Sequence, residues 1–489
     1  MIFDVGKTQM SSIIEARTTN QSSGRGEGKV SIAARIDRLP SSRSIWIIVA
    51  LLALGGWFEF YDVFFTGYVA PGMIKSGLFK PESLGPLKSL SVIAFSGFGT
   101  FVFATFSGLW VGTILVSQLL ERFGRRAVFT WALIWYVACS AVLAFQTTGF
   151  AIDVWRFLGG IGIGVEFTTI DSYLAEMTPR HMRGQAFAVQ QTISFLAVPF
   201  VAFVSWLLIP TSPLGFDGWR WVVLIGSVGA IVVWFMRLRL TESPRWLVKH
   251  GREEEADRIV SALEARVERE TGRPLPPPIA GLADEVGSGS YGEMFQAPYL
   301  RRIIMLSLFN LAGAFSYYGF AAWVPTLLAH RGINVTHSLE YAFIIAIANP
   351  FGPIFGTFFA EKFERKWILC SALAAMILFM FLFAHMSSVP ALITCGVLFT
   401  LAANVQAFAS HSYQSEIFPT RFRMRAVGFV WSWLRISSAF SGLIVGTLVA
   451  TEGVPGVAAL IGVTTLIQIL LIAFLGPRST GLSLEEINK

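Results

Sequence analysis

Long apolar stretches recur along the whole chain, and they limit the available folds more than any other feature. Twelve of them alternate with polar segments. A helix needs about 20 apolar residues to cross the hydrocarbon core of a bilayer, because each residue advances it by about 1.5 Å. Only 14% of the residues are charged, whereas about 25% are charged in soluble proteins. The sequence therefore predicts an all-α integral membrane protein with twelve transmembrane helices.

The apolar stretches set approximate limits for these helices. The predicted spans are 45–70, 94–120, 127–145, 149–175, 185–209, 219–240, 302–328, 339–360, 367–385, 389–414, 426–450 and 454–476. Residues 1–44 are polar, contain no signal-peptide pattern and are expected to form a disordered tail.

Two motifs occur twice at the same separation. "ERFGRR" begins at Glu121 and "EKFERK" at Glu361, while "EMTPRHMRG" begins at Glu176 and "EIFPTRFRM" at Glu416, so both offsets are 240 residues. This spacing predicts duplication of a six-helix unit, and parallel halves with a binding site between them are typical of transporters. The expected organisation is a tail (1–44), a first half (45–240), a linker with surface helices (241–300), a second half (301–476) and a second tail (477–489).

Positive charge is distributed unevenly between the loops. The short loops on the side of both termini hold 11 Lys and Arg residues, and those on the opposite side hold 5. Because cytoplasmic loops are richer in Lys and Arg, we expect cytoplasmic termini and a multi-pass protein of the plasma (inner) membrane. The net charge of +7 then reflects topology and does not indicate nucleic-acid binding. The expected partners are the lipid bilayer and a small-molecule substrate, and the expected state is a monomer.

Several motifs together resemble the major facilitator superfamily. "ERFGRR" is similar to its loop motif after helix 2, and four other segments resemble its sugar-porter branch: "FYDVFFTG" (60–67), "RFLGGIGIG" (156–164), "YLAEMTPRHMRG" (173–184) and "TESPRWL" (241–247). The resemblance covers roughly 45–476 and includes "EIFPTR" (416–421). It implies two six-helix halves that move by alternating access.

The resemblance to sugar porters weakens at the substrate site. The seventh helix, "SLFNLAGAFSYYG" (307–319), lacks the Gln-Gln pair of that branch, and His411 stands where those proteins carry a Trp. Gln191 matches a sugar-contacting Gln. Residues 411–438 look closer to metabolite–proton symporters and to the organic-ion and synaptic-vesicle-glycoprotein-like branch. Arg435 matches an arginine that is implicated in anion binding there.

Two acids lie inside the first predicted helix. At 100° per residue, Glu59 and Asp62 lie about 60° apart, on the face that also carries Gly55 and Thr66. A charge at mid-bilayer costs about 2.5–3.5 kcal/mol on insertion scales, so such residues usually face a cavity or a partner. The pattern predicts that both acids line a cavity; a buried acid satisfied by neighbouring helices is the alternative.

Asp62 and Arg156 lie at comparable depths in their helices, and the resemblance implies that such a pair acts as a proton switch. Burial favours a neutral carboxyl group and a nearby arginine favours the carboxylate, so a pair that approaches and separates would bind and release a proton. Glu166, in the middle of the fourth helix, is either a second proton site or a substrate contact. Asp171, nearer the cytoplasmic end, is interpreted as a capped or solvated acid.

Arg435 lies about 15 Å into the eleventh helix, near the midplane. A permanently charged guanidinium there needs an anion, which is either a substrate carboxylate or a protein acid. The further candidates for substrate contact are Gln191, His411, Tyr317, Tyr318 and Asn404.

The duplicated motifs place charged residues at the cytoplasmic ends of the helices. In the superfamily such residues form ion pairs that close the inner side, so we interpret them as a gate and not as substrate ligands. They are Glu121, Arg122, Arg125, Arg126, Glu176, Arg183, Glu361, Arg365, Glu416 and Arg423.

These observations favour a proton-coupled symporter of a small organic anion, such as an aromatic or sugar acid. The alternatives are a neutral sugar or polyol symporter, an exporter of metabolites or drugs, and a receptor-like sensor that does not transport. We expect no enzymatic activity, metal or cofactor, because the sequence shows no catalytic or metal-binding constellation; the proton gradient is the expected driving force.

Overall fold

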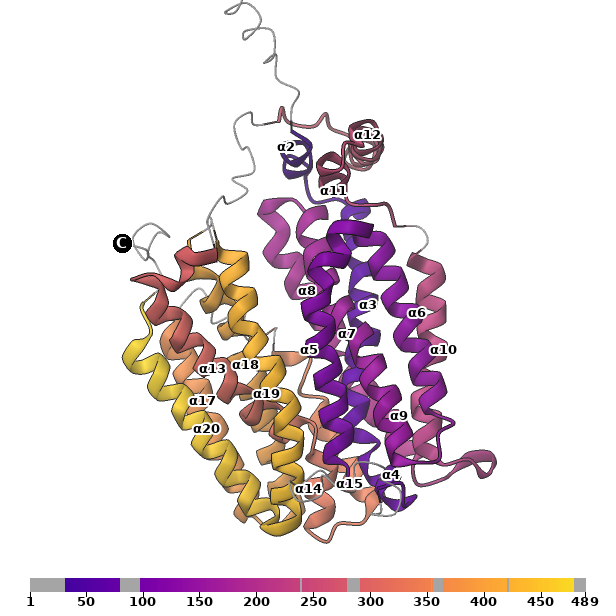
Figure 1. Ribbon diagram of the computed structural model, residues 1–489, viewed down its shortest axis with the longest axis vertical. Coiled ribbons are helices and arrows are strands. Elements are labelled where there is room, and N and C mark those ends of the chain that lie inside the picture. Colours follow the sequence, from indigo (N-terminus) through magenta and orange to yellow (C-terminus); the bar gives the residue numbers. More distant parts are fainter. Residues whose placement is uncertain are drawn as a thin grey trace, which may run out of the picture.

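The computed structural model describes residues 31–79, 97–237, 240–278, 291–352, 354, 364–419 and 422–478. In this part of the chain all regular elements are helices. Figure 1 shows two helical bundles side by side, with a small group of helices above the bundle that the first half forms. The predicted all-α architecture is confirmed.

The first bundle contains the helices of residues 43–237. α3 (Arg43–Tyr68) is followed by the short α4 (Ala70–Lys75), and then by α5 (Gly99–Phe123), α6 (Arg125–Leu143), α7 (Gly149–Met177), α8 (Arg183–Phe195), α9 (Ala197–Leu208) and α10 (Gly218–Arg237). The span predicted at 185–209 is two helices, separated at Leu196. Pro199 explains the break, since proline has no N–H to donate to the preceding turn.

The second bundle repeats this plan. It contains α13 (Tyr299–Ala321), α14 (Val324–His330), α15 (Val335–Ala346), α17 (Arg365–His385), α18 (Val389–Glu416), α19 (Arg423–Thr451) and α20 (Gly453–Leu475). The span predicted at 302–328 is also divided, and Pro325 lies in the first turn of α14, where proline is tolerated. Most of the predicted span 339–360 beyond Gly352 lies outside the described residues.

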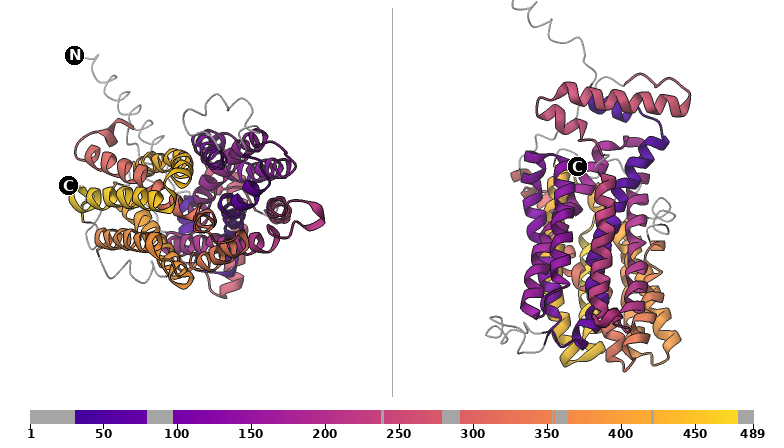
Figure 2. Two further views of the ribbon diagram at one scale, coloured as in Figure 1. Left: turned by 90° about the horizontal axis from the view of Figure 1, so that it is seen from below. Right: turned by 90° about the vertical axis from the view of Figure 1, so that its right-hand side faces the viewer.

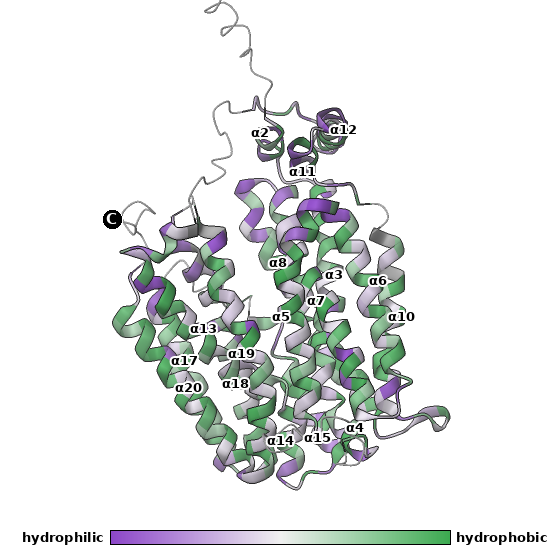
Figure 3. Cartoon of the chain, in the orientation of Figure 1, coloured by the Kyte–Doolittle hydropathy of each residue, from purple (hydrophilic) through white to green (hydrophobic). Residues whose placement is uncertain are grey.

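Nine helices of the described chain are long and apolar enough to cross a membrane. α7 is not among them, although it lies inside the first bundle, because four charged residues interrupt its apolar sequence: Asp153, Arg156, Glu166 and Asp171. The outer surfaces are apolar, as Trp131 and Phe474 illustrate with exposed fractions of 68% and 76%. Figure 3 shows hydrophilic residues concentrated at the linker end of the bundles. This distribution is the one that a surrounding bilayer requires.

Three helices cover the linker end of the first bundle: α2 (Ile32–Asp37), α11 (Pro244–Lys249) and α12 (Glu253–Thr271). α12 coincides with the amphipathic helix expected in the linker. The expectation of a disordered tail is wrong for residues 31–44. The apolar Ile36 and Leu39 are buried there, and Arg35 and Arg38 both donate hydrogen bonds to Glu264 of α12.

The two bundles touch mainly near the end that is remote from the linker. The rings of Phe98 and Trp323 lie 5.5 Å apart, and those of Phe106 and Tyr318 lie 4.6 Å apart. Gly99 leaves no space for a side chain beside the backbone of Gly442. These contacts join the first turns of α5 to the end of α13, to the start of α14 and to α19. The bundles diverge toward the linker (Figure 1).

Candidate functional site

Asp62 and Arg156 form a buried ion pair inside the first bundle. The Nη1 atom of Arg156 lies 2.6 Å from Oδ2 of Asp62, and the two residues have exposed fractions of 1% and 5%, respectively. α3 supplies the acid and α7 the arginine, as their similar depths predicted. A buried pair is stable only if the remaining polar atoms are also bonded.

Hydroxyl groups from three helices complete this pair. Ser140 of α6 donates to Oδ1 of Asp62 at 3.1 Å. Arg156 donates through Nε to Thr105 of α5 at 2.8 Å, and through Nη2 to Thr66 and to the carbonyl of Asp62, both at 2.7 Å. The guanidinium also lies over the ring of Phe65. Each nitrogen of the guanidinium is thus bonded, and the two carboxylate oxygens of Asp62 bond Arg156 and Ser140.

Glu59 and Glu166 lie deep in the same bundle. Their exposed fractions are 2% and 0%, so neither lies on a solvated surface. The charge of Glu59 acts on Arg435 across the interface between the bundles. Glu59 therefore connects the acidic interior of the first bundle with the site described next.

Arg435 of α19 lies between the two bundles, with its guanidinium carbon 4.5 Å from the ring centre of Phe167 on α7. Glu59 and Asp171 are the acids whose charges attract it. Arg435 forms no ion pair within 4 Å, and no hydrogen bond, with any side chain that the structure describes. An arginine held over an aromatic ring with its donors unused is suited to bind an anion.

Asp171 and His411 flank this arginine from opposite bundles. Both are solvent-exposed and lie within the last two turns of long helices, α7 and α18. The imidazole of His411 stacks on the indole of Trp431, with ring centres 4.2 Å apart. We define the central site as Phe167, Asp171, Tyr318, His411 and Arg435. It combines aromatic faces with one permanent positive charge.

Asn404 and Tyr317, two further predicted contact residues, lie within the second bundle, and Gln191 lies in the first. Asn404 is buried and donates to Oδ1 of Asn349 at 3.1 Å, and the hydroxyl of Tyr317 lies 3.5 Å from Oδ1 of Asn404. Gln191 of α8 is half-buried, and its neighbour Gln190 is the buried glutamine that donates to Ser194. The structure brings Tyr318, His411 and Arg435 together but places Asn404 in packing contacts.

The gate candidates form equivalent ion pairs in both halves. Arg125 donates to Glu176 through Nη2 at 2.8 Å, and Arg365, which follows 240 residues later, donates to Glu416. Glu121 pairs with Lys249 at 3.1 Å, and Arg122 lies over Phe123. Arg183 donates to the carbonyl of Thr178. The pairs Arg125–Glu176 and Arg365–Glu416 each join residues within one bundle, and Glu121–Lys249 joins the first bundle to α11 of the linker.

For two of the gate candidates the structure gives no side-chain contacts. Glu361 and the side chain of Arg423 lie outside the described residues. Glu242, which the sequence did not single out, accepts hydrogen bonds from the backbone N–H groups of Arg125 and Arg126. It anchors the start of α6 to the segment before α11.

Several site residues were missed by sequence reasoning. Ser140, Thr105 and Phe167 have no sequence signal, because hydroxyl and aromatic residues are common in membrane helices. Asp171 was interpreted as a capped or solvated acid, and it is exposed, but its position beside Arg435 was not expected. Among the described residues, no group of His, Cys, Asp or Glu is arranged to hold a metal ion.

Two helical bundles with a charged, solvent-accessible site between them define a multi-pass membrane transporter. The chain belongs to the sugar (and other) transporter family of the major facilitator superfamily, since residues 48–489 match the family model. The family consists of transporters, not enzymes.

The chain aligns with its relatives over nearly their whole length. The chain is 31% identical to YyaJ of Bacillus subtilis (strain 168), whose name assigns it to metabolite transport, over 91% of this chain and 95% of that protein. It is 27% identical to the niacin transporter NiaP of Acinetobacter baylyi over 93% and 99%. A partially occluded inward-open structure of the xylose transporter XylE from Escherichia coli matches with a TM-score of 0.72 and 19% identity, covering 90% and 99% of the two chains. This last likeness concerns the fold.

Proposed function

We propose that this protein is a proton-coupled symporter of a small organic anion with an aromatic or sugar-acid skeleton. The observation that carries the proposal is Arg435, which lies between the bundles without an ion pair to any described residue. A guanidinium at this depth is stabilised by an anion, and the carboxylate of a substrate would supply it.

Aromatic groups around Arg435 support an aromatic acid. Phe167, Tyr318 and the stacked His411–Trp431 pair offer ring faces on both sides of the site. Ring faces favour planar ligands through offset or edge-to-face contacts. The relative NiaP is named for niacin, a pyridine carboxylic acid that combines a planar ring with one carboxylate.

Proton coupling is assigned to Asp62. Protonation of its carboxyl group would remove the charge that holds Arg156, and the hydrogen bonds to Thr66 and Thr105 would keep the arginine bonded meanwhile. XylE, which shares this fold, is named a proton:xylose symporter. The proton and the substrate would thus bind to different bundles, and their binding would be coupled through the interface where Glu59 attracts Arg435.

The position of the contacts between the bundles supports an opening of the central site toward the linker face. They lie at the end remote from the linker, so the central site communicates with the linker face. Because the charge bias of the loops favours a cytoplasmic linker, we assign this conformation as inward-open in the plasma membrane, with both termini cytoplasmic.

The test compares carboxylates with their neutral counterparts. Purified protein in liposomes is assayed for counterflow and thermal stabilisation with nicotinate against nicotinamide, and glucuronate against glucose. We expect a carboxylate to be selected and Arg435→Ala to weaken its binding at least about 30-fold, as for other buried charge pairs. Arg301→Ala, at an exposed arginine of α13, is the matched control.

A neutral sugar is the second candidate, and Gln191 is the residue that favours it. Selection of glucose over glucuronate, with Arg435→Ala unchanged, would replace the proposed substrate class by this one. Binding without counterflow would indicate a sensor.

A further inference from the structure

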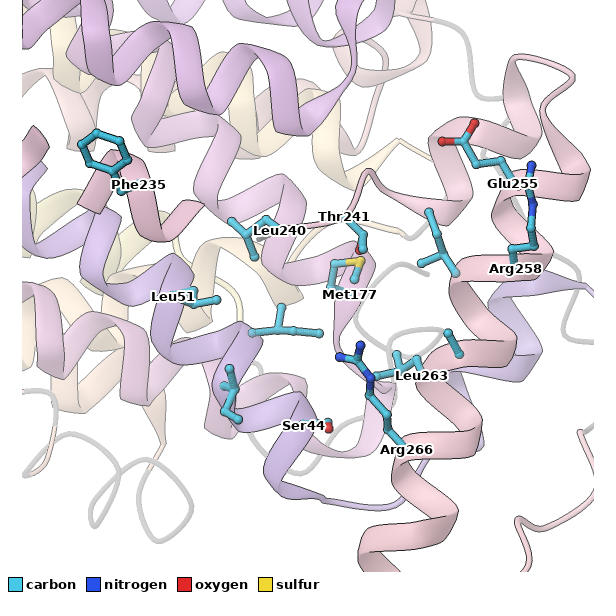
Figure 4. Close-up of a pocket in the computed structure, with 14 residues that line it drawn as sticks. Ser44, Leu51, Met177, Phe235, Leu240, Thr241, Glu255, Arg258, Leu263 and Arg266 are labelled. Atoms are coloured by element: carbon cyan, nitrogen blue, oxygen red, sulfur yellow. The ribbon is translucent and has the colours of Figure 1, made fainter. Parts of the chain in front are cut away.

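A pocket of about 840 Å³ lies outside the central site, at the linker end of the first bundle. Its floor is formed by the first turns of α3, including Ile47 and Leu51, and by Phe235 near the end of α10. Its roof is one face of α12. Figure 4 shows the residues of α3 and α10 on one side of this space and those of α12 on the other.

The floor is continuous with the apolar outer surface of the bundle. Ile47 and Phe235 have exposed fractions of 48% and 59%, and Ile231, one turn before Phe235, is 47% exposed. In a membrane-spanning helix, such a surface contacts acyl chains. The pocket therefore opens toward lipid and not only toward water.

The roof carries positive charge at helical spacing. Arg258, Ala262 and Arg266 follow one another at intervals of four residues, and Ile259 lies three residues before Ala262, so they share the face of α12 that lines the pocket. In Figure 2, α12 runs across the ends of the transmembrane helices. α12 is amphipathic and carries seven acids and three arginines, two of which, Arg258 and Arg266, lie on the face toward the pocket. An amphipathic helix in this orientation is typical of a helix at the level of lipid headgroups.

Two acids of α12, Glu255 and Glu264, pair with arginines that do not line the pocket. Glu264 accepts hydrogen bonds from Arg35 and Arg38 of the α2 segment, and Glu255 pairs with Arg252 at 2.5 Å. Arg266 pairs with no acid that the structure describes. In Figure 4 its guanidinium points toward Met177, at the centre of the pocket. Arg258 donates only to the carbonyl of Glu254 in its own helix, at 3.3 Å, among the described groups.

We propose that this pocket binds an anionic phospholipid of the leaflet on the linker side. Its headgroup phosphate would lie between Arg258 and Arg266, and one acyl chain would lie along Ile47, Leu51 and Phe235. The charge of the roof is complementary to the phosphate, and the lipid-facing floor accommodates the chain. The bound lipid would join α12 to α3 and α10, and so would stabilise the linker on the first bundle.

The experiment uses full-length protein purified in a mild detergent. Thermal unfolding is measured during titration with palmitoyl-oleoyl phosphatidylglycerol, with the matched phosphatidylcholine, and with glycerol 3-phosphate as a headgroup without chains. We expect saturable stabilisation by phosphatidylglycerol alone. Arg258→Gln and Arg266→Gln should each weaken it about fivefold, because one basic residue near a membrane surface contributes about that factor.

Arg269→Gln is the matched control, since Arg269 is on the same helix, does not line the pocket, and donates to the carbonyl of Ala265. Ala262→Trp, which fills the pocket without changing its charge, should abolish the effect and keep the unfolding temperature without lipid. Equal stabilisation by both lipids, an equal loss in Arg269→Gln and Arg266→Gln, or full stabilisation by glycerol 3-phosphate would each overturn the proposal.

Discussion

The interiors of the two bundles are polar in different ways. The first buries ionisable residues: Glu59, Asp62, Arg156 and Glu166. The second buries amides, which bond one another: Asn310 donates to Gln414 at 3.0 Å, and Gln414 donates back at 3.2 Å. Halves with the same repeated motifs at their linker ends have thus diverged in their interiors.

This difference gives the two interiors different physical properties. An ionisable interior can change its charge, at the cost of needing a partner for every charge. An amide interior does not titrate, and its satisfied network holds one arrangement. In the function proposed above, the second bundle presents Arg435 from a fixed framework, while the first responds to protons.

The largest expected effect comes from Asp62→Asn, which removes the charge but keeps the size of the side chain. We expect proton-driven accumulation to disappear while counterflow continues, because Asn cannot carry the proton. Arg156 would lose its ion partner, and about 3–5 kcal/mol of stability would be lost with it. Uptake into liposomes with and without an imposed pH gradient measures the first effect.

Asp153→Asn is the control for this comparison. Asp153 is also buried in the first bundle, on α7, but forms no ion pair with a described residue. If Asp153→Asn abolishes accumulation and Asp62→Asn does not, the assignment of the proton to Asp62 is wrong.

Substitutions inside the second bundle should change the stability of the protein and not the coupling of uptake to the pH gradient. Asn310→Leu or Gln414→Leu each removes both hydrogen bonds between the two amides, and the remaining amide keeps, among the described groups, only its bond to Ser410 or to the carbonyl of Val430. The buried group that loses its partner costs about 1–3 kcal/mol. The double variant removes both amides, so its loss should be smaller than the sum of the two. Thermal unfolding of the purified variants gives this interaction energy, and additive losses would contradict the pairing. The dependence of uptake on the pH gradient should not change.

The repeated ion pairs allow the same substitution, glutamate to glutamine, to be made at equivalent positions of both halves. Glu176→Gln and Glu416→Gln weaken partly exposed pairs, so each should cost only about 1 kcal/mol. Glu176→Gln should have the larger effect, because Glu176 also accepts a hydrogen bond from Ser243. Unfolding temperatures and counterflow rates test this order. Equal effects would show that the Ser243 contact adds nothing.

The smallest effect lies outside both bundles, at Glu264. Burial alone would raise the pKa of this carboxyl group, but hydrogen bonds from Arg35 and Arg38 outweigh burial and lower it below its ordinary value. Its stabilisation of the linker is therefore present above about pH 4.5 and is lost as the pH falls below that value. Limited proteolysis of the linker at pH 7 and pH 4 should show less than about 1 kcal/mol of change. Glu264→Gln should remove this pH dependence.

Sequence patterns predicted the helices and the depth of their charges well, since both depend on local periodicity. The meeting of Asp62 with Arg156 followed from depth and resemblance together. The surroundings could not be predicted, because no rule of spacing shows that Ser140 and Thr105 from two other helices would complete the pair. Asp171 is exposed near the linker end of α7, in agreement with its interpretation as a solvated acid. Its position beside Arg435 could not be predicted, because it depends on how the two bundles are assembled.

Because of the aromatic contacts near Phe98 and Trp323, the two end states of the transport cycle should be held by different kinds of interaction. In this conformation the bundles adhere through apolar rings, which salt hardly affects. The opposite conformation must give up that adhesion and rely on charged residues at the linker ends, whose attraction weakens with ionic strength. High salt on the linker side should therefore slow the half of the cycle that closes this face, and leave the other half unchanged.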